Sequence, residues 1–477
     1  MKYLLILPGV LVLLVLIAVV RTLVSPRKTS DYQPPQTDEA EALRLAGKLS
    51  KMIQVDTTSH AGGDDPARFR AFHKTLAELF PRVFSQLEKT EIDGNLLFYW
   101  KGRSQERPIL LMSHQDVVPA EGAWSHAPFS GDIADGKVWG RGASDTKCSV
   151  MAFFEAAEQL LAEGYTPPTD VYLASSCTEE WAGDGAPKLV AELQRRGVEL
   201  FLVCDEGGAI ISEPIGGIPG NFAMVGVFEK GKADVKFTAK STGGHASAPG
   251  KHTPIARLAA FVMEVETHSP FKKKLLPEVA AMFRTLAPYA SSFGLRLLLG
   301  NLWLFAPLLK LVLPAVSAQA GAMLRTTIAF TTQSGSDAYN VIPQEATLGA
   351  NMRFIPHQGE QESLAIIQTL AEKHGLSTEV LHANDFTPPV DIHGEAFTLF
   401  TRVISETFPG LAASPYVMTG ATDAQFYQPI CKSCIRFAPV IYGPEQMRGM
   451  HGLNENIEYR CLPGAVRFYQ NLIRAEK

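Results

Sequence analysis

The sequence contains few charged residues, few cysteines and no large excess of either charge. Charged residues make up 19% of its 477 positions, and the formal net charge is −5. Such a balance provides no overall basic surface, so we expect no nucleic-acid partner. Six cysteines are too few for a dense disulfide framework in a chain of this length. No N-x-S/T sequon occurs either, which favours a compartment without N-glycosylation.

Apolar residues are plentiful by comparison. They account for 46% of the chain, and 9% of all residues are aromatic. That composition rules out a disordered or fibrous protein, and the length corresponds to roughly three domains of ~150 residues. We therefore expect a core that is large enough to stabilise the fold without disulfides.

The first apolar run covers residues 3–20 and contains no charge. At about 1.5 Å rise per residue, this run nearly spans the ~30 Å hydrocarbon core of a bilayer. We therefore predict a single-pass transmembrane anchor over residues 3–24, followed by a polar tether over residues 25–39. A cleaved signal peptide and a buried core helix are the alternatives. Basic residues flank the run on both sides, so the side of the membrane stays open.

Strand-like and helix-like stretches alternate along most of the remaining chain. This pattern predicts an α/β fold with a doubly wound, mostly parallel sheet. Residues 230–355 differ, because stretches such as ADVKFTAK alternate with a period of two, as half-exposed strands do. We interpret them as a smaller α+β lid or dimerisation domain, inserted into a catalytic domain made of residues 40–229 and 356–477.

A second apolar segment, residues 293–318, lies within the predicted lid region. It is interrupted by Arg296, Asn301, Pro307, Lys310 and Pro314. These residues argue against a membrane-spanning helix. One interpretation is a buried or dimer-packed pair of helices; the other is an apolar surface that meets a membrane or a fatty substrate.

Residues that can bind metals follow directly on three apolar, strand-like runs. They are His114, Glu180 and Asp205. Ligands of open α/β sheets bind at the carboxyl ends of the strands, so we expect these three side chains to lie close together. Each has an ordinary structural explanation when taken alone, such as a loop histidine or a solvated acidic turn.

Two further candidates lie in glycine-flanked loops, Asp145 in GRGASDTK and His451 in MHGLNEN. For Asp145 the alternative role is to cap the helix that follows. Two histidines and three carboxylates form a donor set that suits zinc, and one carboxylate can bridge two ions. Glu179 precedes Glu180 directly, and such a pair can divide metal binding from proton transfer.

The order of the motifs identifies a family resemblance. SHQDVVP, W-x-x-x-PF, GRGASDTK, TEE, DEGG, GGHASAP, NVIP and MHGLNE follow one another along the chain. From about residue 40 onward, the sequence resembles the zinc-dependent carboxypeptidases and aminoacylases, which include carboxypeptidase S, Gly-X carboxypeptidase, carnosinase and N-fatty-acyl amino acid hydrolases. The N-terminal run and the insert at residues 271–325 most resemble the carboxypeptidase S branch.

The resemblance implies a centre that holds two zinc ions. His114 and Asp205 would bind one ion, and Glu180 and His451 would bind the other. Asp145 would bridge the two ions.

The resemblance also implies roles for five residues outside the ligand set. Asp116 would orient a metal-binding histidine, and Glu179 would act as general base and then as general acid. His245 would reach a neighbouring active site and stabilise the developing oxyanion, which implies a homodimer formed through the lid. Asn340 and Arg353 would bind substrate, with Arg353 holding a free carboxylate.

The chain departs from the family pattern at one position. The family often has Asp or Asn after the bridging aspartate, with a cis peptide bond between the two. Here Thr146 follows Asp145, so the resemblance does not settle the form of this bond.

The expected function is hydrolysis of an amide bond next to a free carboxylate. The expected substrate is a short peptide, cleaved by carboxypeptidase action, or alternatively an N-acyl amino acid. Two other classes compete: a thiol redox protein that uses Cys431 and Cys434, and an inactive membrane scaffold. The complete ligand set argues against a scaffold. The C-x-x-C pair does not open a helix after a strand, as it would in a thiol oxidoreductase.

Overall fold

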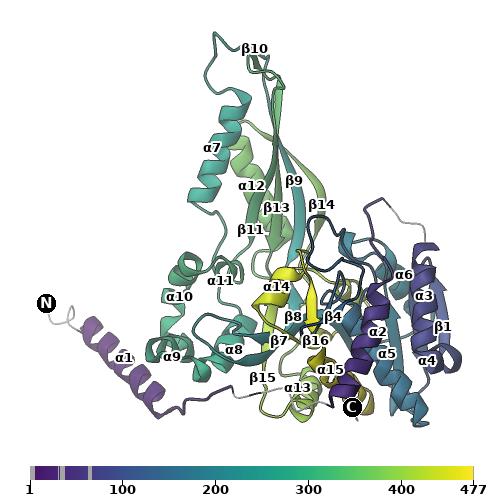
Figure 1. Ribbon diagram of the computed structural model, residues 1–477. Helices are drawn as coiled ribbons and strands as arrows, with labels where there is room; N and C mark the ends of the chain where they lie inside the picture. Colours follow the sequence, from purple (N-terminus) through teal and green to yellow (C-terminus); the bar gives the residue numbers. More distant parts are fainter. Residues whose placement is uncertain (1–5, 31, 33–37, 63–66, 476–477) are drawn as a thin grey trace.

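An eight-stranded sheet forms the centre of the larger domain (Figure 1). The computed structural model describes residues 6–30, 32, 38–62 and 67–475. In spatial order the strands are β1 (Glu88–Ile92), β2 (Asn95–Trp100), β6 (Thr169–Ser175), β3 (Ser104–Met112), β7 (Leu202–Ser212), β16 (Cys434–Tyr442), β8 (Asn221–Glu229) and β15 (Ala412–Met418). Strands β6, β3, β7 and β16 run parallel to one another, and β15 runs parallel to β8.

The sheet is mixed, which corrects the prediction of a mostly parallel sheet. Strand β2 is antiparallel to β1 and β6, and β8 is antiparallel to β7. A two-residue turn, Asp93–Gly94, joins β1 to β2, and both of its residues have positive φ. Connections this short can join only antiparallel strands. The alternation of strands with helices gave no sign of these hairpins, because no helix lies inside them.

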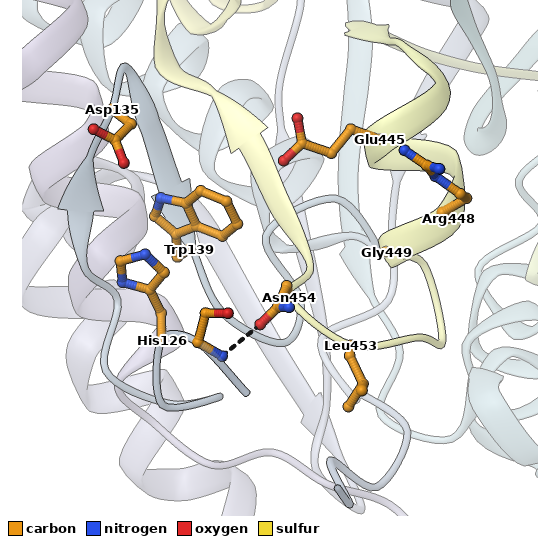
Figure 2. Close-up of a pocket in the computed structure, with 9 residues that line it drawn as sticks. His126, Asp135, Trp139, Glu445, Arg448, Gly449, Leu453 and Asn454 are labelled. Carbon is orange, nitrogen blue, oxygen red and sulfur yellow. Dashed lines mark hydrogen bonds between the residues drawn. The ribbon is translucent and has the colours of Figure 1, made fainter. Parts of the chain in front are cut away.

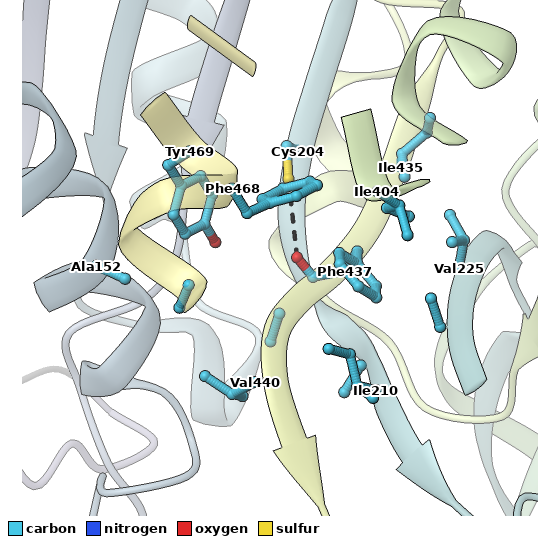
Figure 3. Close-up of a cluster of buried hydrophobic side chains, with 14 of the residues drawn as sticks. Ala152, Cys204, Ile210, Val225, Ile404, Ile435, Phe437, Val440, Phe468 and Tyr469 are labelled. Carbon is cyan, nitrogen blue, oxygen red and sulfur yellow. Dashed lines mark hydrogen bonds between the residues drawn. The ribbon is translucent and has the colours of Figure 1, made fainter. Parts of the chain in front are cut away.

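Helices cover both faces of the sheet and complete two apolar cores. Figure 3 shows part of the first core, where Phe468 lies against Phe437 of β16 with ring centroids 5.4 Å apart. The helices that contribute to this core include α2 (Glu39–Ile53), α3 (Ala67–Leu79), α4 (Pro81–Gln86), α5 (Lys147–Ala162), α13 (Glu395–Thr407) and α15 (Leu462–Arg474). The opposite face is covered by α6 (Gly185–Arg195) and the 3-10 helix η4 (Asp423–Tyr427). The polar loops at the strand ends are thereby held by a rigid, layered core.

The smaller domain extends away from the central sheet (Figure 1). Its antiparallel sheet has the order β11 (Thr327–Ser334), β13 (Glu345–Phe354), β9 (Gly231–Lys240) and β14 (Ser377–Asn384). Helices α7 (Pro254–Thr267) and α12 (Glu360–Lys373) complete its separate core. At its tip β10 (Gly244–His245) pairs with β12 (Val341–Ile342). Because α12 and β14 belong to this sheet and core, the predicted boundary at residue 355 falls inside the domain.

The apolar insert packs on the larger domain, which corrects its predicted assignment to the smaller domain. It comprises α8 (Pro277–Leu286), the 3-10 helix η3 (Ala287–Tyr289), α9 (Phe293–Gly300), α10 (Leu302–Val316) and α11 (Ala318–Ala322). Helix α8 lies along β15, and its buried residues Val279, Met282 and Phe283 join the first core. Their spacing places these apolar side chains on one face of α8, which explains the packing.

The described part of the N-terminal run lies in one helix, α1 (Ile6–Val24). Among the described residues, no single helix is both long and apolar enough to cross a membrane. Helix α9 and residues 302–315 meet that length and composition only as a pair, bent by 109° at their junction. The predicted transmembrane anchor over residues 3–24 is thus not supported, and its first three residues lie outside the described residues. Membrane localisation stays a prediction.

The described part of the predicted tether lies against the body of the protein. Lys28 N donates to the Pro288 carbonyl at 2.9 Å, and Ser30 Oγ donates to the Asn221 carbonyl at 2.6 Å. Tyr32 is only 5% exposed. Residues 31 and 33–37 of the predicted tether lie outside the described residues.

Candidate metal centre

Three neighbouring parallel strands bring the candidate residues to one edge of the central sheet. Strand β3 leads into the loop of His114, β6 leads into the 3-10 helix η2 (Glu179–Trp181), and β7 contains Asp205. Strands β6, β3 and β7 are neighbours, and β3 pairs with residues 202–204 of β7, so Asp205 lies level with the carboxyl end of β3 while β7 continues to Ser212. The side chains of His114 and Asp205 are almost completely buried. The strand order thus delivers residues far apart in sequence to one place.

His114, Asp145 and Glu180 form a group that can hold a metal ion. Each offers one ligand atom, and these atoms lie within 4.8 Å of one another. His114 Nε2 is 3.2 Å from Asp145 Oδ1. The Asp145–Thr146 peptide bond that follows is cis.

His451 also contacts two members of this group. Its Nε2 is 3.0 Å from Asp145 Oδ2 and 3.0 Å from Glu180 Oε2. The two carboxylate oxygens of Asp145 therefore face two different histidines. This is the arrangement that a carboxylate bridging two ions requires.

The electrostatics of the group fit a cation. Glu180 Oε1 is buried and has no hydrogen-bond partner among the described atoms. Burial, followed by charges that include that of Asp145, raises the pKa of Glu180 above its usual range. Burial also raises the pKa of Glu179 well above its usual range. Carboxylates crowded in a buried site ionise readily only when positive charge is supplied, and a divalent ion would supply it.

Asp116 organises the site through two different groups. Its backbone carbonyl accepts a hydrogen bond from His114 Nδ1 at 2.9 Å, which directs Nε2 of that ring toward Asp145. Its carboxylate accepts hydrogen bonds from the backbone N–H groups of Glu179 and Glu180, at 3.2 and 3.1 Å. Asp116 is fully buried. It therefore fixes the orientation of the histidine and of the turn that carries both glutamates.

Asp205 lies at this edge but outside the group defined above. Its Oδ1 accepts from Glu206 N at 2.8 Å, and its Oδ2 accepts from Ala424 N at 2.8 Å. The sequence analysis selected Asp205 and not the neighbouring Glu206, whose pKa is raised well above its usual range first by burial and then by the charge of Asp145. The motif DEGG contains both residues and gives no sign of which one would face a bound ion.

Glu455 is a second residue that sequence reasoning missed. It is fully buried, and its Oε1 accepts from the backbone N–H groups of Gly142, Ser144 and Asp145 at 3.1, 2.8 and 2.9 Å. Its Oε2 accepts from Arg141 Nη1 at 2.8 Å. The loop that carries His451 thus holds the loop that carries Asp145. The motif MHGLNEN contained this residue, but its contacts depend on the folding of two distant loops against each other.

A cleft of about 340 Å³ lies beside the His451 loop (Figure 2). His126 stacks on Trp139 along one side, and Glu445 and Arg448 of α14 (Pro444–Gly449) lie on the other. Asn454 joins the two sides, since its Oδ1 accepts from Ser125 N at 2.7 Å. Most of the side chains that line this cleft are polar or charged. Trp139, which lines the cleft, belongs to a small three-stranded sheet made of β4 (Ile133–Ala134), β5 (Lys137–Trp139) and β17 (Asn456–Glu458). Along the chain, the 3-10 helix η5 (Tyr459–Cys461) follows β17.

The predicted substrate-binding residues lie in the smaller domain. His245 is in β10, at the outer tip of the smaller domain and away from the central sheet (Figure 1). Asn340 lies beside it, since the backbone N–H of Ala246 donates to the Asn340 carbonyl at 3.0 Å. Arg353 lies on β13, where its Nε donates to Asn351 Oδ1 at 3.0 Å. The structure of one chain thus brings His245 and Asn340 together, but it does not bring them to the metal centre.

The cysteine pair offers little to a redox reaction. Cys431 and Cys434 are both buried free thiols, as are the other four cysteines. Thiol–disulfide exchange needs an accessible thiolate.

Comparison with curated proteins finds relatives that match nearly the whole chain. The N-fatty-acyl-amino acid synthase/hydrolase of Xenopus tropicalis is 33% identical, over 97% of this chain and 93% of its own length. The probable carboxypeptidase S-like 2 protein of Dictyostelium discoideum is 31% identical, over 98% of this chain and 92% of its own length.

Solved structures share the fold at lower identity. The metallo-carboxypeptidase Sso-CP2 of Sulfolobus solfataricus has a TM-score of 0.68 at 16% identity, covering 92% of this chain and 99% of its own. A Bacillus subtilis protein described as a dinuclear metal binding peptidase has a TM-score of 0.55 at 14% identity, covering 91% and 98%. The model of peptidase family M20/M25/M40 matches residues 110–475. With the relatives above, this match shows that the chain belongs to peptidase family M20/M25/M40, a family of hydrolytic metalloenzymes.

Proposed function

We propose that the chain is a di-zinc hydrolase that cleaves an amide bond next to a free carboxylate. The observation that carries this proposal is the position of Asp145 between two histidines, beside the paired glutamates. His114 and Asp205 would hold one ion, and Glu180 and His451 would hold the other. Bound zinc would polarise the amide carbonyl and make a water molecule more acidic.

Glu179 would move the proton in this reaction. Its Oε2 lies 3.9 Å from His114 Nε2, and its backbone is held by Asp116. Burial raises the pKa of Glu179, which makes it a stronger base once bound metal ions allow it to ionise, and the carboxylate would then accept a proton from the attacking water. The same group then donates that proton to the nitrogen of the departing amine.

Two substrates fit this chemistry, and we propose short peptides first. The second candidate, an N-acyl amino acid, is favoured by the printed name of the Xenopus relative. Both present a carboxylate next to the scissile amide.

Arg353 provides a test of substrate class. We expect Arg353→Ala to raise KM for dipeptides or N-acyl amino acids about 10–100-fold, because a charge-assisted hydrogen bond contributes about 1.5–3 kcal/mol. KM for C-terminally amidated substrates should stay the same. Lys232→Ala is the matched control, since Lys232 pairs with Arg353 in the sheet register. Equal losses on free and amidated substrates would contradict the carboxylate contact.

The ratio of rates on dipeptides and N-acyl amino acids decides between the two substrates.

Asp205 and Glu206 provide a test of the ligand set. The hydrogen bonds to both Asp205 oxygens match those that orient metal-binding carboxylates in proteins. We expect Asp205→Asn to lower the zinc content of purified protein from two ions per chain to one, and Glu206→Gln to keep both. Elemental analysis of protein equilibrated in zinc buffers measures this. The reverse pattern would assign the role to Glu206.

We also propose that the smaller domain forms a homodimer in which His245 acts in the partner's active site. Its exposed position at the outer tip supports this proposal. His245→Ala and Glu179→Gln should each be inactive alone. When the two variants are mixed and allowed to exchange subunits, the mixture should recover up to about a quarter of wild-type activity. Half of the dimers then contain one chain of each variant, and one of the two active sites in such a dimer is intact. If His245 acted within its own chain, the mixture would stay inactive.

We propose, finally, that α1 contributes to a membrane anchor. Its length of 19 residues and its lack of acidic residues support this.

A further inference from the structure

Two helices expose apolar side chains to solvent, α10 along one side and α1 around most of its circumference. On α10 these include Trp303, Leu308, Leu311 and Val312, which are 40–69% exposed. On α1 they are Val10, Leu11, Val12, Leu13, Leu16, Ile17, Val20, Leu23 and Val24. Soluble proteins rarely expose so much continuous apolar surface unless another molecule covers it.

The contact between α1 and the insert has the character of a helix contact in lipid. Asn301 Nδ2 donates to Thr22 Oγ1 at 2.9 Å, and Thr22 Oγ1 donates to the Ala18 carbonyl at 2.8 Å. Arg296 Nη2 donates to the carbonyls of Thr22 and Ser25, at 3.1 and 2.7 Å. Ala18, Thr22 and Asn301 are buried. Small residues and interhelical hydrogen bonds join helices where the surroundings are apolar.

A basic cleft opens beside this contact. It encloses about 160 Å³, and Arg21, Arg284 and Arg296 line it together with Asn301. None of its lining residues is acidic. The sequence also has no acidic residue between Glu278 and Asp337. Arginine binds phosphate through two parallel hydrogen bonds, so a cluster of three suits a phosphate group.

We propose that this cleft binds the phosphate headgroup of an anionic glycerophospholipid in a bilayer, while the exposed face of α10 contacts the acyl chains. Trp303 links the two parts, since its Nε1 donates to Asn301 Oδ1 at 3.3 Å. Amphipathic surfaces of this kind lie in the interface, with aromatic residues at headgroup depth. The insert packs on the edge strand β15, which β16 and β8 separate from β7. The lipid site is therefore distinct from the metal centre.

Fluorescence quenching tests the contact of α10 with lipid. The full-length protein is reconstituted into vesicles of phosphatidylcholine and phosphatidylglycerol, with bromine on the acyl chains of one lipid. Helix α1 contains no tryptophan, so the signal is independent of the proposed α1 anchor. We expect brominated lipid to quench the wild type clearly more than Trp303→Phe. Equal quenching of the two proteins overturns the proposal, even if both remain in the vesicles. Tryptophan emission that changes with protein concentration but not with bromine would mean that a second copy of the chain covers the exposed face of α10. That result also overturns the proposal.

The headgroup part is tested by comparing which lipid carries the bromine. We expect stronger quenching when it is on phosphatidylglycerol than when it is on phosphatidylcholine, at equal mole fractions. Arg21→Gln with Arg284→Gln should abolish this preference, because each basic residue strengthens binding to an anionic surface about fivefold. Lys240→Gln with Lys373→Gln, on the smaller domain, removes the same charge elsewhere and should keep it. The proposal of a phosphate site is overturned if the wild type shows no stronger quenching by brominated phosphatidylglycerol. It is also overturned if the two double variants show the same preference.

Discussion

Glu179→Gln should lower kcat by about 10²–10⁴-fold, because general acid–base catalysis contributes roughly that factor. The amide cannot accept the proton of the attacking water or return it to the leaving amine. The Glu179 side chain is 14% exposed, and burial raises its pKa well above the usual range. Steady-state kinetics on a dipeptide and on an N-acyl amino acid measure the loss.

The adjacent glutamate makes the matched comparison for this prediction. Glu179→Gln should retain the wild-type zinc content, whereas Glu180→Gln should lose zinc from the His451 side, where Glu180 Oε2 lies 3.0 Å from the imidazole. Both variants keep the backbone N–H groups that Asp116 accepts. A Glu179→Gln enzyme that kept most of its rate would remove Glu179 from the mechanism. Loss of zinc from it would assign Glu179 to the ligand set.

The part of the site that the sequence predicts best is the part that local patterns encode. His114 and Glu180 each follow an apolar strand closely, and parallel strands place their ends at one edge. Asp145 and His451 were found as residues of glycine-flanked loops, and the structure brings both to Glu180. Their roles as zinc ligands remain proposals.

The parts that the sequence did not predict depend on contacts between distant segments. Strand β14 follows a helix, as a catalytic-domain strand would, yet it pairs with β9 of the smaller domain. The apolar spacing of α8 predicts a buried face but not the strand that covers it. The short turn between β1 and β2 makes that pair antiparallel, which the alternation of helices and strands obscures.

The contacts of Glu455 also depend on distant segments, so local sequence patterns did not predict them. Substitution of Glu455 has the second-largest effect that we expect. Its buried carboxylate accepts four hydrogen bonds, three from the backbone of the Asp145 loop and one from Arg141. Arg141 is itself only 2% exposed. Removing one partner of a buried charge pair costs about 3–5 kcal/mol, because the other charge stays buried and unpaired.

We therefore expect Glu455→Gln to lower the free energy of unfolding by about that amount and to weaken zinc binding about 10–100-fold, as other losses of groups that orient metal ligands do. Denaturant unfolding and zinc-buffered titration measure the two effects separately. Rate at saturating zinc should largely recover, because Glu455 touches the loop and not the substrate. Glu445→Gln is the control, since Glu445 pairs with Lys137 near the surface and should change neither quantity. A Glu455→Gln protein that is less stable but binds zinc normally would mean that the Asp145 loop keeps its shape without this carboxylate, and the link between the two loops would be structural only.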